Sequence, residues 1–223
     1  IAYSIHQFFN DRGFYYIHTP IITASDAEGA GEMFKVTTLD LDHLPRTETH
    51  EINFKEDFFG RASNLTVSGQ LEAELAAMGL GQVYTFGPTF RAENSNTPRH
   101  LAEFWMIEPE VAFADLVDNM NLAEDLLKYV IRAIIEKCSE DLQFLQDREA
   151  EEDKSKPQAD RNEMPLKDRL MFCIEHDFER ITYTEAVEIL KNSTPNKKGK
   201  FQFPVQEWGI DLQSEHERYL VEK

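Results

Sequence analysis

The chain has 223 residues, of which 41% are hydrophobic and 29% are charged, the profile of a globular protein with one large domain. Its apolar runs fall far short of the roughly 18 residues that a membrane helix needs, so we expect no membrane span. Cys138 and Cys173 are far apart and form no C-x-x-C pair, which fits a reducing cytosol, so we expect a cytoplasmic protein. A formal net charge of -18 repels nucleic acid over most of the surface, so any contact with RNA must be local or come from further sequence.

The first elements alternate between helix and strand. Apolar residues at helical spacing predict a helix over residues 1–12, which Gly13 ends. Aromatic and β-branched residues predict a strand over 14–23, interrupted by Pro20. Because the sequence opens inside the helical pattern without a methionine, we expect further polypeptide before it.

A strand, a helix and a hairpin follow in the middle of the chain. We expect a strand over 64–69, a helix over 70–80, and two alternating strands over 82–93 and 103–113 that form a hairpin. A long amphipathic helix is predicted over 114–145.

The remaining sequence predicts a polar segment and more helix. Residues 146–163 contain no aliphatic side chain larger than alanine, typical of a solvated helix end or a mobile insertion. A strand edge then leads into a helix over 180–193, with Thr184 as its cap. The whole pattern predicts an α+β fold, an antiparallel sheet flanked by helices, in three parts: 1–145, 146–163 and 164–223.

The hairpin carries the most chemistry. Strand residues two apart share a face, so Arg91 and Glu93 point the same way, and the returning strand brings Phe104 and Glu108 to that surface if the register allows. Arginine pairs bidentately with phosphate or carboxylate, and a phenylalanine ring can stack on a purine. On these residues alone, an ordinary surface ion pair between Arg91 and Glu93 is the favoured interpretation.

Several stretches in this order resemble one enzyme family. "FRAENSNTPRHLAEF" (90–104) resembles the second signature motif of class II aminoacyl-tRNA synthetases, and "FFNDRGFYYIHTPII" (8–22) resembles the first. "TVSGQLEAE" (66–74) is similar to the amino-acid-binding segment of the aspartate/asparagine/lysine subgroup. "WGIDLQSEHERYL" (208–220) resembles its asparagine-specific members.

The resemblance implies roles for individual residues. Arg91 would contact the α-phosphate of ATP and the substrate carboxylate, and Phe104 would stack on adenine. The other implied ATP-binding residues are Glu93, Arg99 and His100, and the implied amino-acid-binding residues are Glu28, Ser68, Gln70 and Glu74. No metal-binding side chains are predicted, since neighbouring residues of "SEHER" do not face one ligand.

The resemblance also implies the reaction and its partners. ATP, with Mg²⁺, would activate asparagine to an adenylate, and the acyl group would pass to tRNA(Asn), bound largely through segments outside this sequence. Pro20 would mark the interface of a homodimer. On this basis 1–145 and 164–223 belong to one catalytic core.

Three alternatives stay open within this interpretation. Aspartyl relatives carry a lysine at the position of Ala73, so an aspartyl-tRNA synthetase or a synthetase-like asparagine synthetase is disfavoured. A non-catalytic regulatory module should have lost Arg91, Glu93 or Phe104. Because nothing matches the family's third, glycine-rich motif, we expect a truncated core with little activity alone.

Overall fold

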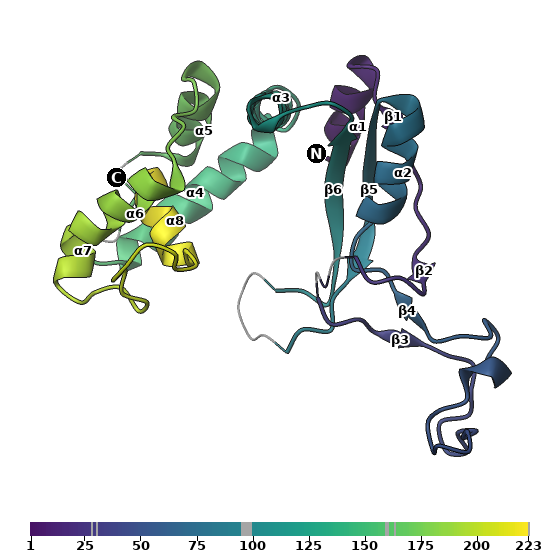
Figure 1. The fold of residues 1–223 in the computed structure, drawn as a ribbon. Helices are drawn as coiled ribbons and strands as arrows, with labels where there is room; N and C mark the ends of the chain where they lie inside the picture. Colours follow the sequence, from purple (N-terminus) through teal and green to yellow (C-terminus); the bar gives the residue numbers. More distant parts are fainter. Residues whose placement is uncertain (28, 30, 95–99, 159–160, 163, 223) are drawn as a thin grey trace. The chain divides into compact units, whose positions relative to one another are not determined.

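The computed structural model describes every residue except 28, 30, 95–99, 159–160, 163 and 223 (Figure 1). The chain divides into two compact units, Ile1–Leu170 and Met171–Lys223. No helix in the described part of the chain is long and apolar enough to cross a membrane.

The first unit is built on a three-stranded sheet with the order β1-β5-β6. β5 (Gln82–Phe90) and β6 (Glu103–Val111) pair antiparallel along their whole length, from Gln82 opposite Val111 to Phe90 opposite Glu103. The predicted hairpin is therefore confirmed. β1 (Tyr15–Tyr16) adds to β5 in parallel, so the sheet is mixed rather than wholly antiparallel.

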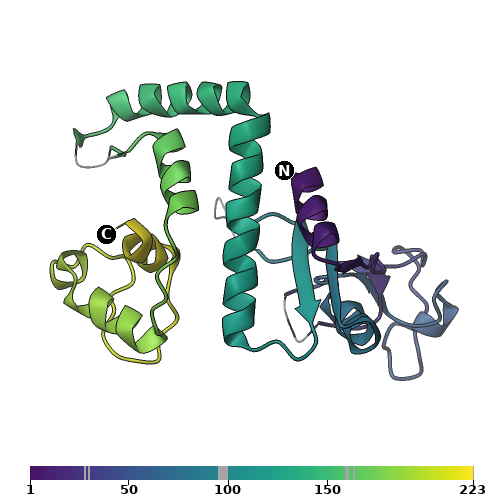
Figure 2. The ribbon, with the colours of Figure 1, turned by 90° about the horizontal axis from the view of Figure 1, so that it is seen from above.

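Helices cover both faces of this sheet. Successive residues of β5 point to opposite faces, and both faces carry apolar side chains that need a covering layer. α1 (Ala2–Asp11) and α3 (Leu116–Lys137) lie side by side next to the sheet (Figure 2). Tyr84 and Phe86 pack in the same core as Phe8 and Phe9 of α1, which are fully buried. Burial of such side chains is worth about 1.5–3 kcal/mol each. Val83 faces the other way and packs against Ala73 and Ala77 of α2 (Gln70–Leu80).

A second small sheet has the order β2-β4-β3, and its pairs are antiparallel. Its strands are β2 (Ile22–Thr23), β3 (Lys35–Val36) and β4 (Ser63–Leu65), and a short helix, η1 (Phe54–Glu56), precedes β4. The strand predicted over 14–23 is thus two short strands in different sheets. Pro20 lies in the break, where its missing N–H costs no ladder hydrogen bond.

The prediction of a single helix over 114–145 is wrong. α3 ends at Lys137, and α4 (Ser139–Ser155) begins after Cys138, whose ψ of 40° leaves the helical region. The polar segment that starts at residue 146 begins as the solvated end of α4. Pairs one turn apart, such as Arg148 with Glu152, stabilise it in place of an apolar stripe.

The second unit is a small helical assembly that begins within α5 (Leu166–Glu175). Its core joins Val187 and Leu190 of α6 (Tyr183–Asn192) to Val205 in the loop that follows α7 (Thr194–Lys197). α8 (Ser214–Glu222) closes it. The strand edge predicted before α6 is not found among the described residues of that stretch, and the helix cap is Thr182 rather than Thr184.

Candidate active site

Arg91 follows the last residue of β5 and lies beside the start of β6. The register places Thr89 opposite Phe104, and the Arg91 N–H donates to the Ala102 carbonyl at 3.1 Å, which extends the pairing beyond Phe90. The guanidinium carbon of Arg91 lies 5.5 Å from the centroid of the Phe104 ring. The expected shared face of Arg91 and Phe104 is therefore present, with a cation–π contact between them.

The Arg91 side chain retains an unused donor. Its Nε is buried and has no hydrogen-bond partner among the described residues, while Nη2 reaches the Val67 carbonyl only at 3.5 Å. A buried donor without a partner costs about 1–3 kcal/mol, and an acceptor supplied by a ligand would recover this. The arrangement suits an anionic oxygen, to which arginine donates in a planar fork.

A glycine lets a neighbouring loop approach Arg91 and Glu93 closely. A Cβ atom on Gly31 would lie 3.1 Å from both Arg91 Cδ and Glu93 Oε1, so a side chain would crowd both. The Ala92 N–H donates to the Glu32 carbonyl at 2.7 Å and ties the loop to the hairpin. The structure thus brings three of the five predicted ATP-binding residues, Arg91, Glu93 and Phe104, to one place.

His100 approaches the same cluster from the far end of the hairpin loop. Its Nε2 lies 3.9 Å from Glu93 Oε2, and both side chains are partly exposed. The structure thus places His100 beside Glu93, next to the cluster of Arg91 and Phe104. The predicted sites Arg99 and Glu28 lie outside the described residues.

The segment before α2 is held by Glu108, which sequence reasoning did not include among the site residues. One oxygen of its carboxylate accepts from the Ser68 hydroxyl, and the other accepts from the Gly69 N–H at 3.0 Å and the Thr85 hydroxyl at 2.9 Å. A Cβ atom on Gly69 would lie 2.7 Å from Thr19 Oγ1, so glycine is required for this close approach. Glu108 shares the sheet face of Phe104 as expected, but it positions the start of α2 instead of joining Arg91.

The remaining predicted pocket residues lie along α2. The Gln70 N–H donates to Ser68 Oγ at 3.0 Å, and the Gln70 side-chain amide donates to Glu74 at 2.9 Å. Ser68 is buried and committed to Glu108, whereas Gln70 is half-buried. Ala73 is fully buried against Ala77 and Val83, so this position offers no cation.

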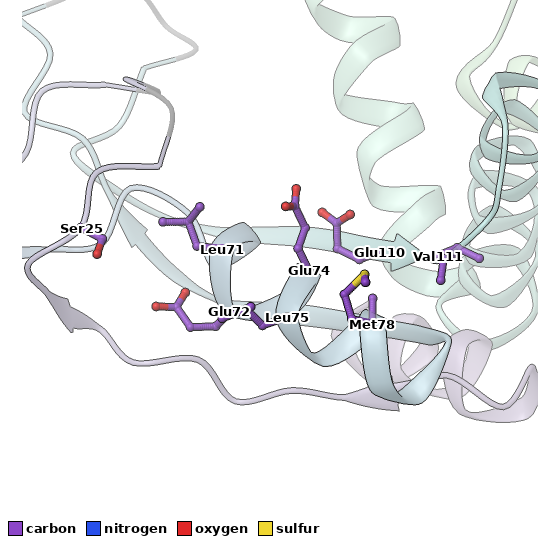
Figure 3. Close-up of a pocket in the computed structure, with 10 residues that line it drawn as sticks. Ser25, Leu71, Glu72, Glu74, Leu75, Met78, Glu110 and Val111 are labelled. Carbon is purple, nitrogen blue, oxygen red and sulfur yellow. The ribbon is translucent and has the colours of Figure 1, made fainter.

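Glu74 also faces a separate groove between α2 and β6. The groove has a volume of about 630 Å³, and its lining includes Glu74, Glu110, Leu75 and Met78 (Figure 3). Burial, followed by the charges of Glu74 and Glu108, raises the pKa of the Glu110 carboxyl. Arg91 and Phe104 do not line this groove. Glu74 lines the groove and also accepts the hydrogen bond from the Gln70 side chain at the start of α2.

No group of three or more histidine, cysteine, aspartate or glutamate side chains could hold a metal ion within the residues that the structure describes. Cys138 and Cys173 are free thiols. The buried His216 donates from Nε2 to the Phe203 carbonyl at 2.7 Å and accepts from the Gln213 N–H at Nδ1, so both of its nitrogens are used within the fold.

The sequence matches the family model of class II tRNA synthetases (D, K and N) over residues 1–223. It is 59% identical over 223 residues to an asparagine–tRNA ligase from Cytophaga hutchinsonii and 56% identical over 222 residues to one from Porphyromonas gingivalis. Each alignment covers 100% of this chain and 44% of the relative. The chain therefore spans less than half the length of the curated relatives that it matches.

The fold of this chain also resembles solved structures of asparaginyl-tRNA synthetases. The asparaginyl-tRNA synthetase of Pyrococcus horikoshii, crystallised with asparaginyl-adenylate, matches with a TM-score of 0.71 and 27% identity over 99% of this chain and 40% of its own. The Entamoeba histolytica enzyme matches with a TM-score of 0.65 at 22% identity, which supports the fold alone, and the match covers 99% of this chain and 39% of its own. The α+β architecture is thus that of part of this catalytic domain.

Proposed function

Because the chain belongs to the class II tRNA synthetases of the D, K and N group, we propose that the protein containing it activates asparagine with ATP and transfers it to tRNA(Asn). The names of its 54–59% identical relatives support the choice of asparagine. We further propose a cytoplasmic homodimer. Exposed aromatic residues on α1 and β1, Tyr3, Tyr15 and Tyr16, support a contact surface near Pro20.

One observation supports this activity most strongly: the buried, unpartnered Nε of Arg91 beside the Phe104 ring. In the proposed complex Arg91 donates to the α-phosphate of ATP and to the asparagine carboxylate, so it holds the two reactants together. Phe104 provides a flat apolar face for adenine. Glu93 then accepts from the adenine amino group or the bound amino acid, and His100 lies toward the outer phosphates together with Arg99.

The proposed chemistry needs no nucleophile from the protein. A carboxylate oxygen of asparagine attacks the α-phosphorus of ATP, the bond to the bridging oxygen breaks, and pyrophosphate leaves. Negative charge that develops at phosphorus is stabilised by the fixed guanidinium of Arg91. A hydroxyl of the 3′-terminal adenosine of tRNA then attacks the acyl carbon, and AMP leaves with the electron pair.

The amino-acid pocket in this proposal is formed around the start of α2. Gln70 offers a neutral hydrogen-bonding group and Glu74 an acidic one. Glu28 would take the α-amino group of the substrate. Ser68 fixes the turn before α2 through its hydrogen bond to Glu108. Ala73 supports asparagine over aspartate, because a buried carboxylate without a cation would lose several kcal/mol.

Magnesium is expected to accompany ATP, but the described part of this chain has no side-chain cluster that fits the ion. The proposed reaction therefore assigns no step to a metal held by these residues. The phosphate contacts proposed for Arg91 stand independently of the metal.

Replacement of Arg91 by lysine in the full-length protein tests the proposal. Lysine keeps the charge but loses the planar fork, so asparagine-dependent ATP–pyrophosphate exchange should fall by about 100-fold or more. Arg12→Lys is a matched control, since the guanidinium of Arg12 also lies over a phenylalanine, 3.7 Å from the centroid of the Phe8 ring. Its exchange rate should stay within about twofold of wild type.

An unchanged thermal midpoint in both variants would show that the fold is intact. If Arg91→Lys then exchanged pyrophosphate as fast as Arg12→Lys, Arg91 would not hold the reacting groups and the proposed site would be wrong.

A further inference from the structure

A lysine-rich turn stands out on the second unit. Residues 191–206 contain four lysines and no acidic residue, in a chain whose net charge is -18. We call Lys197, Lys198 and Lys200 the lysine turn. All three side chains are exposed, and no salt bridge to them is found among the residues that the structure describes. Exposed cations that form no salt bridge are available to an external anion.

The backbone under the lysine turn is held by hydrogen bonds from both sides. The Asn196 side chain donates to the Val205 carbonyl at 3.0 Å and accepts from the Val205 N–H at 2.9 Å. The Glu215 carboxylate accepts from the N–H groups of Gln202 and Phe203 at 3.0 and 2.8 Å. The loop thus loses little conformational entropy when a partner binds.

An aromatic ring lies three residues beyond the turn. Phe203 has 49% of its surface exposed, although its backbone is fixed by Glu215 and by buried His216. Exposed aromatic rings next to lysines are typical of surfaces that bind single-stranded nucleic acid, because bases stack on the ring while phosphates meet the cations.

We propose that the lysine turn binds the phosphate backbone of tRNA, with Phe203 available to stack on an unpaired base. This inference rests on the proposed function, which requires the chain to approach a polyanion despite its own negative charge. A local cationic site resolves that conflict, since phosphate contacts supply most sequence-independent affinity. RNA is favoured over an acidic protein because the exposed ring adds a contact suited to bases.

The triple variant Lys197→Gln/Lys198→Gln/Lys200→Gln of the full-length protein tests this with a tRNA(Asn) transcript. Its affinity for the tRNA should fall by about 10-fold or more. The magnitude of the slope of the log association constant against log salt concentration should decrease by about 2–3, close to one for each phosphate that is no longer neutralised. Affinity for a non-cognate tRNA should fall by the same factor, because binding to the phosphate backbone carries no base readout.

The triple variant Lys55→Gln/Lys154→Gln/Lys167→Gln is a matched control, since it removes equal charge from exposed lysines elsewhere. It should keep the wild-type salt slope. Asparagine-dependent pyrophosphate exchange, which needs no tRNA, should be unchanged in both variants. Absence of exchange in the wild type would instead contradict the proposed function.

An equal loss of tRNA affinity in both triple variants would overturn the inference, because net charge alone would explain it. Unchanged affinity in the lysine-turn variant would overturn it as well. So would a lowered thermal midpoint with normal tRNA binding, which would show that the lysines serve the fold.

Discussion

Arg91 and Glu108 lie on one face of the same hairpin, yet their partners differ. Glu108 accepts from Ser68, Gly69 and Thr85, so both of its oxygens are satisfied by the protein. Arg91 Nε has no partner within the described structure. A satisfied charge fixes its surroundings, whereas an unsatisfied buried donor is ready for a ligand. This difference separates the positioning residue from the proposed substrate-binding residue.

Asp57 is another saturated carboxylate, and it organises the loop between β3 and β4. It accepts from the Thr37 hydroxyl at 2.6 Å, the Thr38 N–H at 2.9 Å and the Phe58 N–H at 2.7 Å. These hydrogen bonds, that of Thr37 foremost, lower the pKa of Asp57 to about 2. A lowered carboxyl pKa stabilises the fold above the ordinary value near 4.

Asp57→Asn should therefore unfold at lower urea concentration than the wild type at pH 7. Ionised Asp57 contributes stability that is lost as the pH falls from about 4 toward 2, so the two midpoints should converge in that window. Urea titrations from pH 7 to pH 2.5 followed by circular dichroism measure this. A gap between the midpoints that stayed constant down to pH 2.5 would contradict the assignment.

Helix α6 shows how an element can begin at a residue other than the expected one. Thr182 accepts from the Glu185 N–H, and Glu185 accepts in return from the Thr182 N–H, which lowers the pKa of the Glu185 carboxyl. The spacing Thr182-x-x-Glu185 is that of a capping box, and Thr184 has no such partner three residues later. The capping-box spacing was present in the sequence, but Thr184 lies only two residues from Thr182 and was predicted as the cap instead.

Thr182→Ala should cost about 1 kcal/mol of unfolding free energy, because it leaves the Glu185 N–H without its acceptor. Thr184→Ala is the control. It removes only an exposed hydrogen bond from the Trp208 indole at 3.1 Å and should cost less than about 0.5 kcal/mol. Denaturant unfolding of both variants measures the difference, and an equal or greater loss in Thr184→Ala would place the cap at Thr184 after all.

The alternation of side chains along a strand predicted those features that depend on local sequence. The hairpin and the shared face of Arg91 and Phe104 follow from strand parity. The break at Cys138 did not, because the apolar pattern continues through it, and neither did the partners of Glu108. Two of those partners, Ser68 and Gly69, lie about 40 residues away, and their contact depends on how α2 packs on the sheet.

At the scale of the molecule, the chain has one side of the proposed nucleotide site and a separate groove between α2 and β6. It spans 44% of its curated relatives, so the activity proposed here belongs to the longer protein. Leu75 and Met78, 75% and 85% exposed, line the open groove with Glu74 and Glu110. With a net charge of -18, the proposed tRNA binding would depend on local cations such as those of the lysine turn.

The amino acid that drives ATP–pyrophosphate exchange by the full-length protein tests the central claim most directly. Exchange should be measured with asparagine and with aspartate at equal concentrations. The account predicts rates at least about 100-fold higher with asparagine, since the pocket offers no cation at Ala73 for a second carboxylate. Equal rates, a preference for aspartate, or no exchange with either amino acid would contradict it.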